Sequence, residues 1–165
     1  MVRRGLLIYA TVAAVAAFCA GQADVRVEPS HLQGPRQLQE QTQAAVVRDY
    51  LQAWKTVGTA LDKNDSGLLD RDFIGTARDK LADGIQQQSA LGIHARYQDK
   101  SHDIQIVFYS PEGLSIELTD DVQYDVEVLD HDKVQTTQRV RARYIVVLTP
   151  AEVRWRVRVF QAQFE

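Results

Sequence analysis

The most constraining feature of the chain is a strict alternation of apolar and polar residues between residues 102 and 164. Successive side chains of a β-strand point to opposite faces, so this alternation predicts strands with one buried face. The apolar positions fall within residues 104–108, 114–118, 122–128, 140–148 and 153–159. Turn signals at residues 110–113, 130–132 and 149–151 divide the stretch into four strands, which predicts an antiparallel meander.

Matching the apolar faces gives the register of this meander, because a slip of one residue would turn a core face toward water. All three hairpins then close with one consistent inner face. We expect Trp155 on that face, covered by the first helix near Trp54, and Arg156 on the outer face. The central predicted pairs are Ile106–Ile116, Leu118–Tyr144 and Val146–Trp155.

Helical patterns precede the strands. Apolar residues between 38 and 61 recur at i, i+3, i+4 and i+7, which predicts an amphipathic helix. A short helix is expected at 68–73 and a third at 76–91, followed by a short strand or extended segment at 93–97. Helices followed by an antiparallel sheet indicate an α+β domain, with N-terminal helices packed on the concave face of a curved meander.

Residues 1–23 have the pattern of a secretory signal peptide: Arg3 and Arg4, an uncharged run to Ala23, and small residues before the expected cleavage site. An uncleaved membrane anchor is the alternative, because about 20 apolar residues span a bilayer. Residues 24–37 lack periodicity and are interpreted as a linker, which leaves one domain at 38–165. The protein is therefore expected outside the cytoplasm, either secreted or periplasmic, or anchored by this segment.

Charge and cysteine content exclude two classes of function. Loss of Arg3 and Arg4 with the first segment takes the formal net charge from −3 to −5, which argues against a nucleic-acid partner. Cys19 is the only cysteine and lies in the same segment, so the mature chain has neither a disulfide nor thiol chemistry.

At this level the chain resembles the nuclear transport factor two-like (cystatin-like cone) superfamily over residues 38–164. The resemblance rests on a long helix with Tyr50 and Trp54, a helix–loop–helix with Leu68-Leu69, Tyr97, and the ending at 153–160. It is similar in particular to inter-membrane-space domains of plastid division proteins and related bacterial envelope domains. The superfamily includes isomerases, dehydratases, hydrolases and many non-enzymes, so the resemblance implies a fold and not an activity.

His102 and Asp120 are the candidate catalytic residues. The register places them opposite each other on the inner face, where a carboxylate can orient an imidazole for acid–base chemistry. The resemblance implies a pocket between sheet and helices. The alternatives are that both groups face water at the end of the sheet and that the aromatic residues are core. The aromatic residues expected to line the pocket are Tyr50, Trp54, Tyr124, Tyr144 and Trp155.

The outer face of the sheet is expected to be rich in arginine. The register places Arg143 opposite Arg158, and Asp121 opposite Arg141. Such a face would bind an acidic partner or anionic lipid headgroups, and the alternative is a solvated surface with cross-strand ion pairs. The arginines assigned to this interaction face are Arg139, Arg141, Arg143, Arg154, Arg156 and Arg158.

Residues 62–70 resemble the first nine positions of an EF-hand calcium loop, with Gly67 at the sixth position. The twelfth position should be a bidentate Glu, but it is Phe73, so a helix-terminating turn explains the same residues. We therefore expect no metal site, and no cofactor.

The sequence favours an exported or membrane-tethered domain that binds an envelope protein or a small ligand and catalyses nothing. The alternative is a small lyase, isomerase or hydrolase that uses His102 and Asp120. The N-terminal segment would contact the membrane if it is not cleaved.

Overall fold

The computed structural model describes residues 22–30, 32 and 36–164. Its strands form one five-stranded sheet in sequence order, with β1 parallel to β2 and the other neighbours antiparallel. This confirms the predicted α+β meander. The elements are β1 (Asp24–Val27), α1 (Glu40–Lys63), the 3₁₀ helix η1 (Ser66–Arg71), α2 (Gly75–Ala90), β2 (Ile93–Tyr109), β3 (Ile116–Asp130), β4 (Lys133–Pro150) and β5 (Trp155–Phe164).

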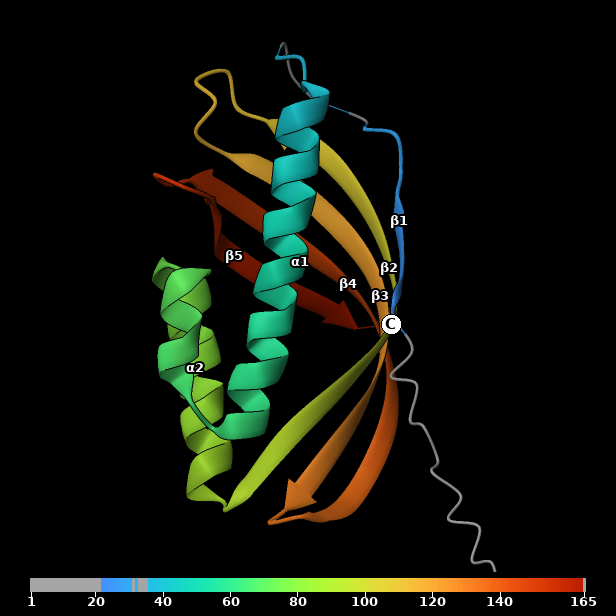
Figure 1. Ribbon diagram of the computed structural model, residues 1–165, viewed down its shortest axis with the longest axis vertical. Helices are drawn as coiled ribbons and strands as arrows, with labels where there is room; N and C mark the ends of the chain where they lie inside the picture. Colours follow the sequence, from blue (N-terminus) through green and yellow to red (C-terminus); the bar gives the residue numbers. More distant parts are fainter. Residues whose placement is uncertain (1–21, 31, 33–35, 165) are drawn as a thin grey trace, which may run out of the picture.

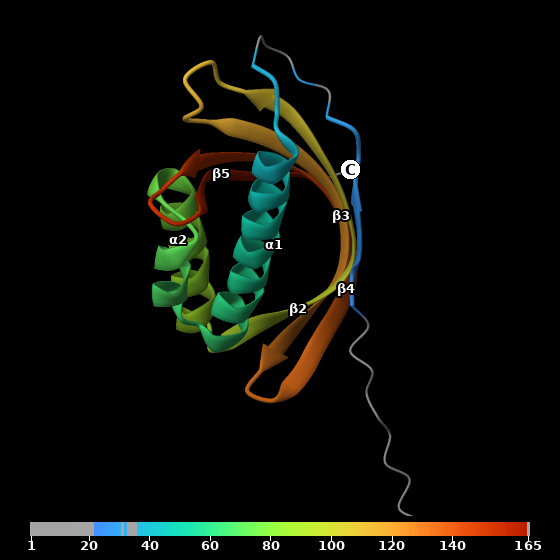
Figure 2. The ribbon, with the colours of Figure 1, turned by 45° about the horizontal axis from the view of Figure 1, so that its top comes forward.

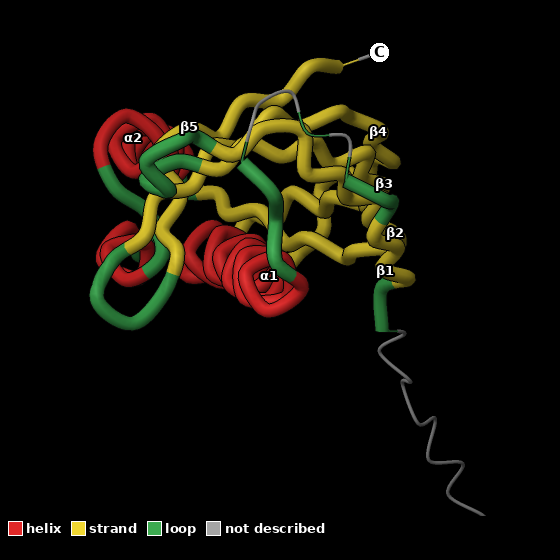
Figure 3. The backbone as a smooth tube through the Cα atoms, turned by 90° about the horizontal axis from the view of Figure 1, so that it is seen from above, coloured by secondary structure: helices red, strands yellow, loops and turns green. Residues whose placement is uncertain are grey.

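The sheet curves around α1, and α2 lies beside α1 on the same concave side (Figures 1 and 2). Viewed from above, α1 lies inside the bend of the strands (Figure 3). The apolar stripe of α1 is buried against the inner face of the sheet, as the i, i+3, i+4 spacing predicts. Its fully buried residues include Val46, Tyr50, Ala53, Trp54 and Val57.

The helix bounds agree with the sequence to within two residues. α1 ends at Asn64, whose left-handed backbone (φ 51°) lets its N–H reach the carbonyls of Ala60 and Leu61. The short second helix is a 3₁₀ helix, and residues 93–97 are the start of a 17-residue strand β2.

The N-terminal part of the expected linker differs from the prediction. Residues 24–27 form β1, which pairs in parallel with Ser101–Ile104 of β2, so the linker assignment is wrong for these four residues. The predicted signal peptide or anchor lies outside the described residues, apart from its last two positions. Within the described part of the chain, no helix has the length and apolar character needed to span a membrane.

The predicted register is wrong by two residues across the first two hairpins. Leu118 pairs with Ile106 and Val146, where Ile104 and Tyr144 were expected. A shift of two preserves the alternation, so the inner face is the predicted one. The cause lies at the first turn, where Leu114 is 60% exposed and the N–H groups of Leu114 and Ser115 bond to Ser110 Oγ.

The third hairpin is further from the prediction. Leu148 pairs with Val157, four residues away from the expected partner, and Arg158 is an extra residue that forms a bulge in β5. A bulge exchanges the two faces of the strand beyond it. Phe160 therefore lies inside against Trp54, not on the outer face, and Trp155 pairs with Pro150 at the sheet end instead of Val146.

The role of Arg156 also departs from the prediction. Its Nη2 donates to the backbone carbonyl of Asp70 and, at 3.0 Å, to that of Phe73, both at the C-terminal end of η1. These carbonyls lie where a 3₁₀ helix runs out of internal donors. Arg156 therefore ties the η1 segment to the edge strand β5.

We predict that Arg156→Ala lowers the free energy of unfolding by about 1–3 kcal/mol, because two carbonyls lose a charged donor. Arg158→Ala is the matched control, because its side chain is exposed and its loss should cost less than about 0.5 kcal/mol. Urea denaturation followed by tryptophan fluorescence measures both values. Equal costs for the two variants would contradict the bracing role of Arg156.

Candidate functional site

A buried hydrogen-bonded chain connects α1 to β3 and β2. Asp120 Oδ2 accepts hydrogen bonds from the Tyr50 hydroxyl and from His102 Nδ1, each at 2.6 Å. The exposed fractions of Asp120, Tyr50 and His102 are 0, 0 and 2%. The predicted convergence of His102 and Asp120 therefore occurs, but in the interior and not at a solvated sheet end.

Asp99 and Trp54 extend this chain toward the surface. His102 Nε2 lies 4.0 Å from Asp99 Oδ2, and Trp54 Nε1 donates to Asp99 Oδ1 at 2.7 Å. The indole also packs edge-on against the imidazole, with 5.2 Å between ring centroids. His102 thus lies between two carboxylates and beneath a tryptophan.

The strands position these groups by their register. Asp120 pairs with Ile104 and Tyr144, so His102 is its diagonal neighbour and not its direct partner as expected. Diagonal neighbours on one sheet face are within reach of long side chains. α1 presents Tyr50 and Trp54 one turn apart on the face that meets the sheet.

A bulge explains why the sequence does not reveal Asp99. Simple alternation places Asp99 and His102 on opposite faces, because they are three residues apart. In β2, Asp99 pairs with Tyr124 and Ser101 with Gln123, so Lys100 is an extra residue. The bulge returns Asp99 and Tyr97 to the inner side of the sheet. Lys100 itself, whose ammonium group lies 3.3 Å from Asp125, gives no such signal in the sequence.

The environment of His102 favours its charged form. Burial lowers the pKa of His102, but the hydrogen bonds and charges of Asp120 and Asp99 outweigh it and raise the pKa to about 9. Burial also raises the pKa of Asp99, but His102 and Trp54 more than compensate and lower it below its usual value. At neutral pH the chain therefore holds an imidazolium.

Tyrosines fill the rest of the interior around this chain. The Tyr124 and Tyr144 hydroxyls lie 3.4 Å apart, and Tyr97 stacks on Tyr124 with ring centroids 4.8 Å apart. Burial and the charge of Asp120 raise the pKa of Tyr50 well above its usual value. Burial likewise raises the pKa of Tyr144. These phenols are neutral packing groups at physiological pH.

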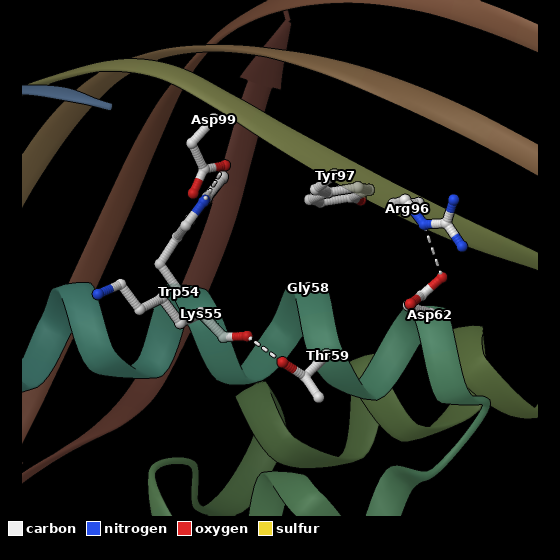
Figure 4. Close-up of a pocket in the computed structure, with 8 residues that line it drawn as sticks. All are labelled: Trp54, Lys55, Gly58, Thr59, Asp62, Arg96, Tyr97 and Asp99. Atoms are coloured by element: carbon white, nitrogen blue, oxygen red, sulfur yellow. Dashed lines mark hydrogen bonds and ion pairs between the residues drawn. The ribbon is translucent and has the colours of Figure 1, made fainter. Parts of the chain in front are cut away.

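Beside the chain, a hollow of about 430 Å³ opens between α1 and β2. We call it the α1–β2 recess. Figure 4 shows Tyr97 and Arg96 of β2 facing Gly58 of α1 across it, with Asp99 at one end and Asp62 at the other. A Cβ on Gly58 would lie 3.9 Å from the Tyr97 Cβ. The full lining is Trp54, Lys55, Gly58, Thr59, Asp62, Arg96, Tyr97 and Asp99.

The aromatic residues expected to line a pocket are mostly in the core. Tyr50, Tyr124 and Tyr144 are buried, and of the five only Trp54 also lines the recess. Trp155 lies apart, half-buried beside Tyr109, and its N–H donates to Asp49. His102 and Asp120 are not among the residues that line the recess.

Four of the six arginines assigned to an interaction face are held by contacts within the domain. Arg143 forms a bidentate pair with Asp121, in place of the expected Arg141, and it pairs with Gln163 and not with Arg158. The expected crowding of Arg143 and Arg158 is therefore wrong. The other three contacts are Arg139 with Asp125, Arg154 with Asp72, and Arg156 with the carbonyls of Asp70 and Phe73.

The calcium-like loop is built as a turn. Asp65 Oδ1 accepts the Gly67 N–H at 3.0 Å and caps η1, whereas Asp62 contacts His94 and Arg96. The potential ligands thus serve other contacts, as the turn interpretation implies. Over the described residues, no cluster of three His, Cys, Asp or Glu side chains is placed to hold a metal ion.

Comparison with solved structures identifies the fold. The intermembrane space region of the chloroplast protein ARC6 is similar with a TM-score of 0.65 and 12% identity, over 79% of this chain and 100% of that one. A putative scytalone dehydratase from Novosphingobium aromaticivorans is similar with a TM-score of 0.57 and 13% identity, over 77% and 89%. Aln2 from Streptomyces gives 0.53 and 11%, over 78% and 94%.

These similarities confirm the nuclear transport factor two-like fold predicted from the sequence, and at such low identity they concern the fold alone. No family model matches the chain, and no curated protein matches it.

The pKa of His102 predicts a pH dependence of stability. A pKa raised from about 6.5 to about 9 stabilises the folded state fully below pH 6.5, and this stabilisation is lost as the pH rises through about 9. The expected loss is on the order of 3 kcal/mol. Unfolding free energies of the wild type and His102→Gln across this range measure it. A His102→Gln profile as steep as the wild type would contradict the raised pKa.

Proposed function

We propose that this domain is a non-catalytic binding module located outside the cytoplasm, and that it takes a small ligand or a partner side chain in the α1–β2 recess. The observation that carries the proposal is the burial of His102. Its Nδ1 bonds to Asp120, its Nε2 faces Asp99, and its ring is covered by Trp54. A general base needs a free lone pair within reach of its substrate, which this imidazolium lacks.

The recess offers a mixed set of binding groups. Tyr97 contributes an aromatic edge, Lys55 and Arg96 are cations, and Asp62 and Asp99 are anions. Asp62 already contacts Arg96 at 3.2 Å, whereas the opposite end has Lys55 near Asp99. A ligand with an aromatic or apolar body and at least one charged group would fit these groups.

The location is supported by two further observations. Residues 1–23 have the pattern of an export signal or anchor, and the similar region of ARC6 lies in an intermembrane space. The enzyme-like neighbours have similar overall shapes, so the fold alone favours neither function.

The recess hypothesis is tested by filling it from the helix side. Gly58→Leu extends a side chain into the recess, whereas Gly58→Ala adds only a Cβ at an ordinary contact distance from Tyr97. Both should match or exceed the wild-type stability, because glycine in a helix interior costs about 1 kcal/mol relative to alanine. The probe is a library of small aromatic acids, amines and amino acids, assayed by thermal shift.

We expect compounds that raise the melting temperature of the wild type and of Gly58→Ala but not of Gly58→Leu. If no compound binds the wild type, or if Gly58→Leu binds the same compounds equally well, the recess is not the binding site.

A small lyase, isomerase or hydrolase is the second candidate, favoured by the 2.6 Å contacts that join Tyr50, Asp120 and His102. It requires that a substrate reach His102 from the recess past Asp99. Diethyl pyrocarbonate tests this, because it modifies accessible neutral imidazoles. We expect rapid modification of His131, whose side chain is 92% exposed, and protection of His102 in the folded protein. Modification of His102 at a similar rate would support the enzyme instead.

A further inference from the structure

A second hollow, of about 490 Å³, lies along α1 against the turn before β5. We call it the basic groove. Arg48 and Lys55 line it from α1, Arg71 from the end of η1, and Val153 and Arg154 from the turn. Arg48 and Lys55 are seven residues apart, about two helical turns, so they project from one side of the helix.

The carboxylates near the groove are occupied from within. Asp49 takes Arg48 on Oδ1 at 2.9 Å and the Trp155 N–H on Oδ2 at 2.8 Å. Asp72, which is 2% exposed, lies beneath the groove and contacts Arg71, Arg154 and the Thr56 hydroxyl. Both acids therefore hold the groove together and do not project into it.

The groove has an excess of positive charge. Arg48, Lys55, Arg71 and Arg154 face only Asp49 and Asp72, which leaves two positive charges uncompensated. The side chains of Arg48 and Arg71 are 68% and 55% exposed. Because the whole chain has a net charge of −3, this local excess is a feature of the groove and not of the composition.

The chemistry of the groove is that of carboxylate recognition. Each guanidinium has five N–H donors in a planar fork, and the contacts to Asp49 and Asp72 use only part of them. Val153, which is 80% exposed, and Leu51 add apolar surface. An acidic side chain followed by an apolar one would match both parts.

We propose that the basic groove binds an acidic, partly apolar peptide segment of a partner protein. This rests on the proposed role as a binding module, but at a site separate from the α1–β2 recess. A peptide is favoured over an anionic lipid surface because the groove is concave and because the net negative charge of the chain opposes approach to an anionic membrane.

The test uses short labelled peptides composed of Glu, Asp, Leu and Gly, with a matched set in which Lys and Arg replace the acids. The groove variant is Arg48→Gln with Lys55→Gln, which leaves the arginines on buried Asp72 intact. The control variant is Lys80→Gln with Lys133→Gln, two exposed lysines elsewhere that remove the same charge. Fluorescence anisotropy gives the affinities.

We expect the wild type and the control variant to select acidic peptides over basic ones, with weaker binding at higher salt. The groove variant should bind them about tenfold more weakly, since two exposed charge contacts are lost. The proposal is overturned if acidic peptides bind no better than basic ones, or if the groove variant binds as tightly as the control. Wild-type binding to phosphatidylserine vesicles without peptide binding would overturn it in favour of lipid.

Gly58→Leu separates the two proposals. Because this variant fills only the recess, it should bind acidic peptides like the wild type even if it has lost small ligands. Peptide binding without any recess ligand would leave the groove standing and remove the recess.

Discussion

The interior of this domain depends on one buried ion pair. His102 and Asp120 are almost completely removed from water, at a desolvation cost that their mutual attraction repays only with good geometry and further hydrogen bonds. Tyr50 from α1 and Asp99 from β2 supply those further contacts. The pair therefore requires α1 to lie where it does, and it links the helix to two strands of the curved sheet by directional bonds as well as by apolar packing.

The sequence predicted the parts of the fold that follow from periodicity. The i, i+3, i+4 spacing of α1 and the alternation of Leu118, Asp120 and Val122 were sufficient to identify the helix and the inner face, and they brought Asp120 and His102 together. Pairing partners were less accessible, because a shift of two residues leaves each apolar face buried. Alternation therefore determines which way a residue points better than what it lies beside.

The remaining errors arise from three extra residues. Lys100 turns Asp99 inward, Val107 buries Tyr109 in place of Phe108, and Arg158 turns Phe160 inward. Each bulge exchanges the faces for everything beyond it in the strand, and a lysine, a valine and an arginine give no local sign of one. The recess residues Tyr97 and Asp99 and the bracing role of Arg156 were missed for the same reason. Bulged strands at such sites are common, and here they define the strand side of the recess.

Lys55 lines both hollows, the recess on one side of α1 and the groove on the other. Its charge helps to lower the pKa of Asp99, so its position is felt inside the recess. A carboxylate in the groove that attracts this ammonium group would withdraw it from Asp99. Thermodynamic reciprocity then requires that each occupant change the affinity of the other by the same factor. A single flexible side chain thus gives this small domain the means for heterotropic coupling without any movement of its backbone.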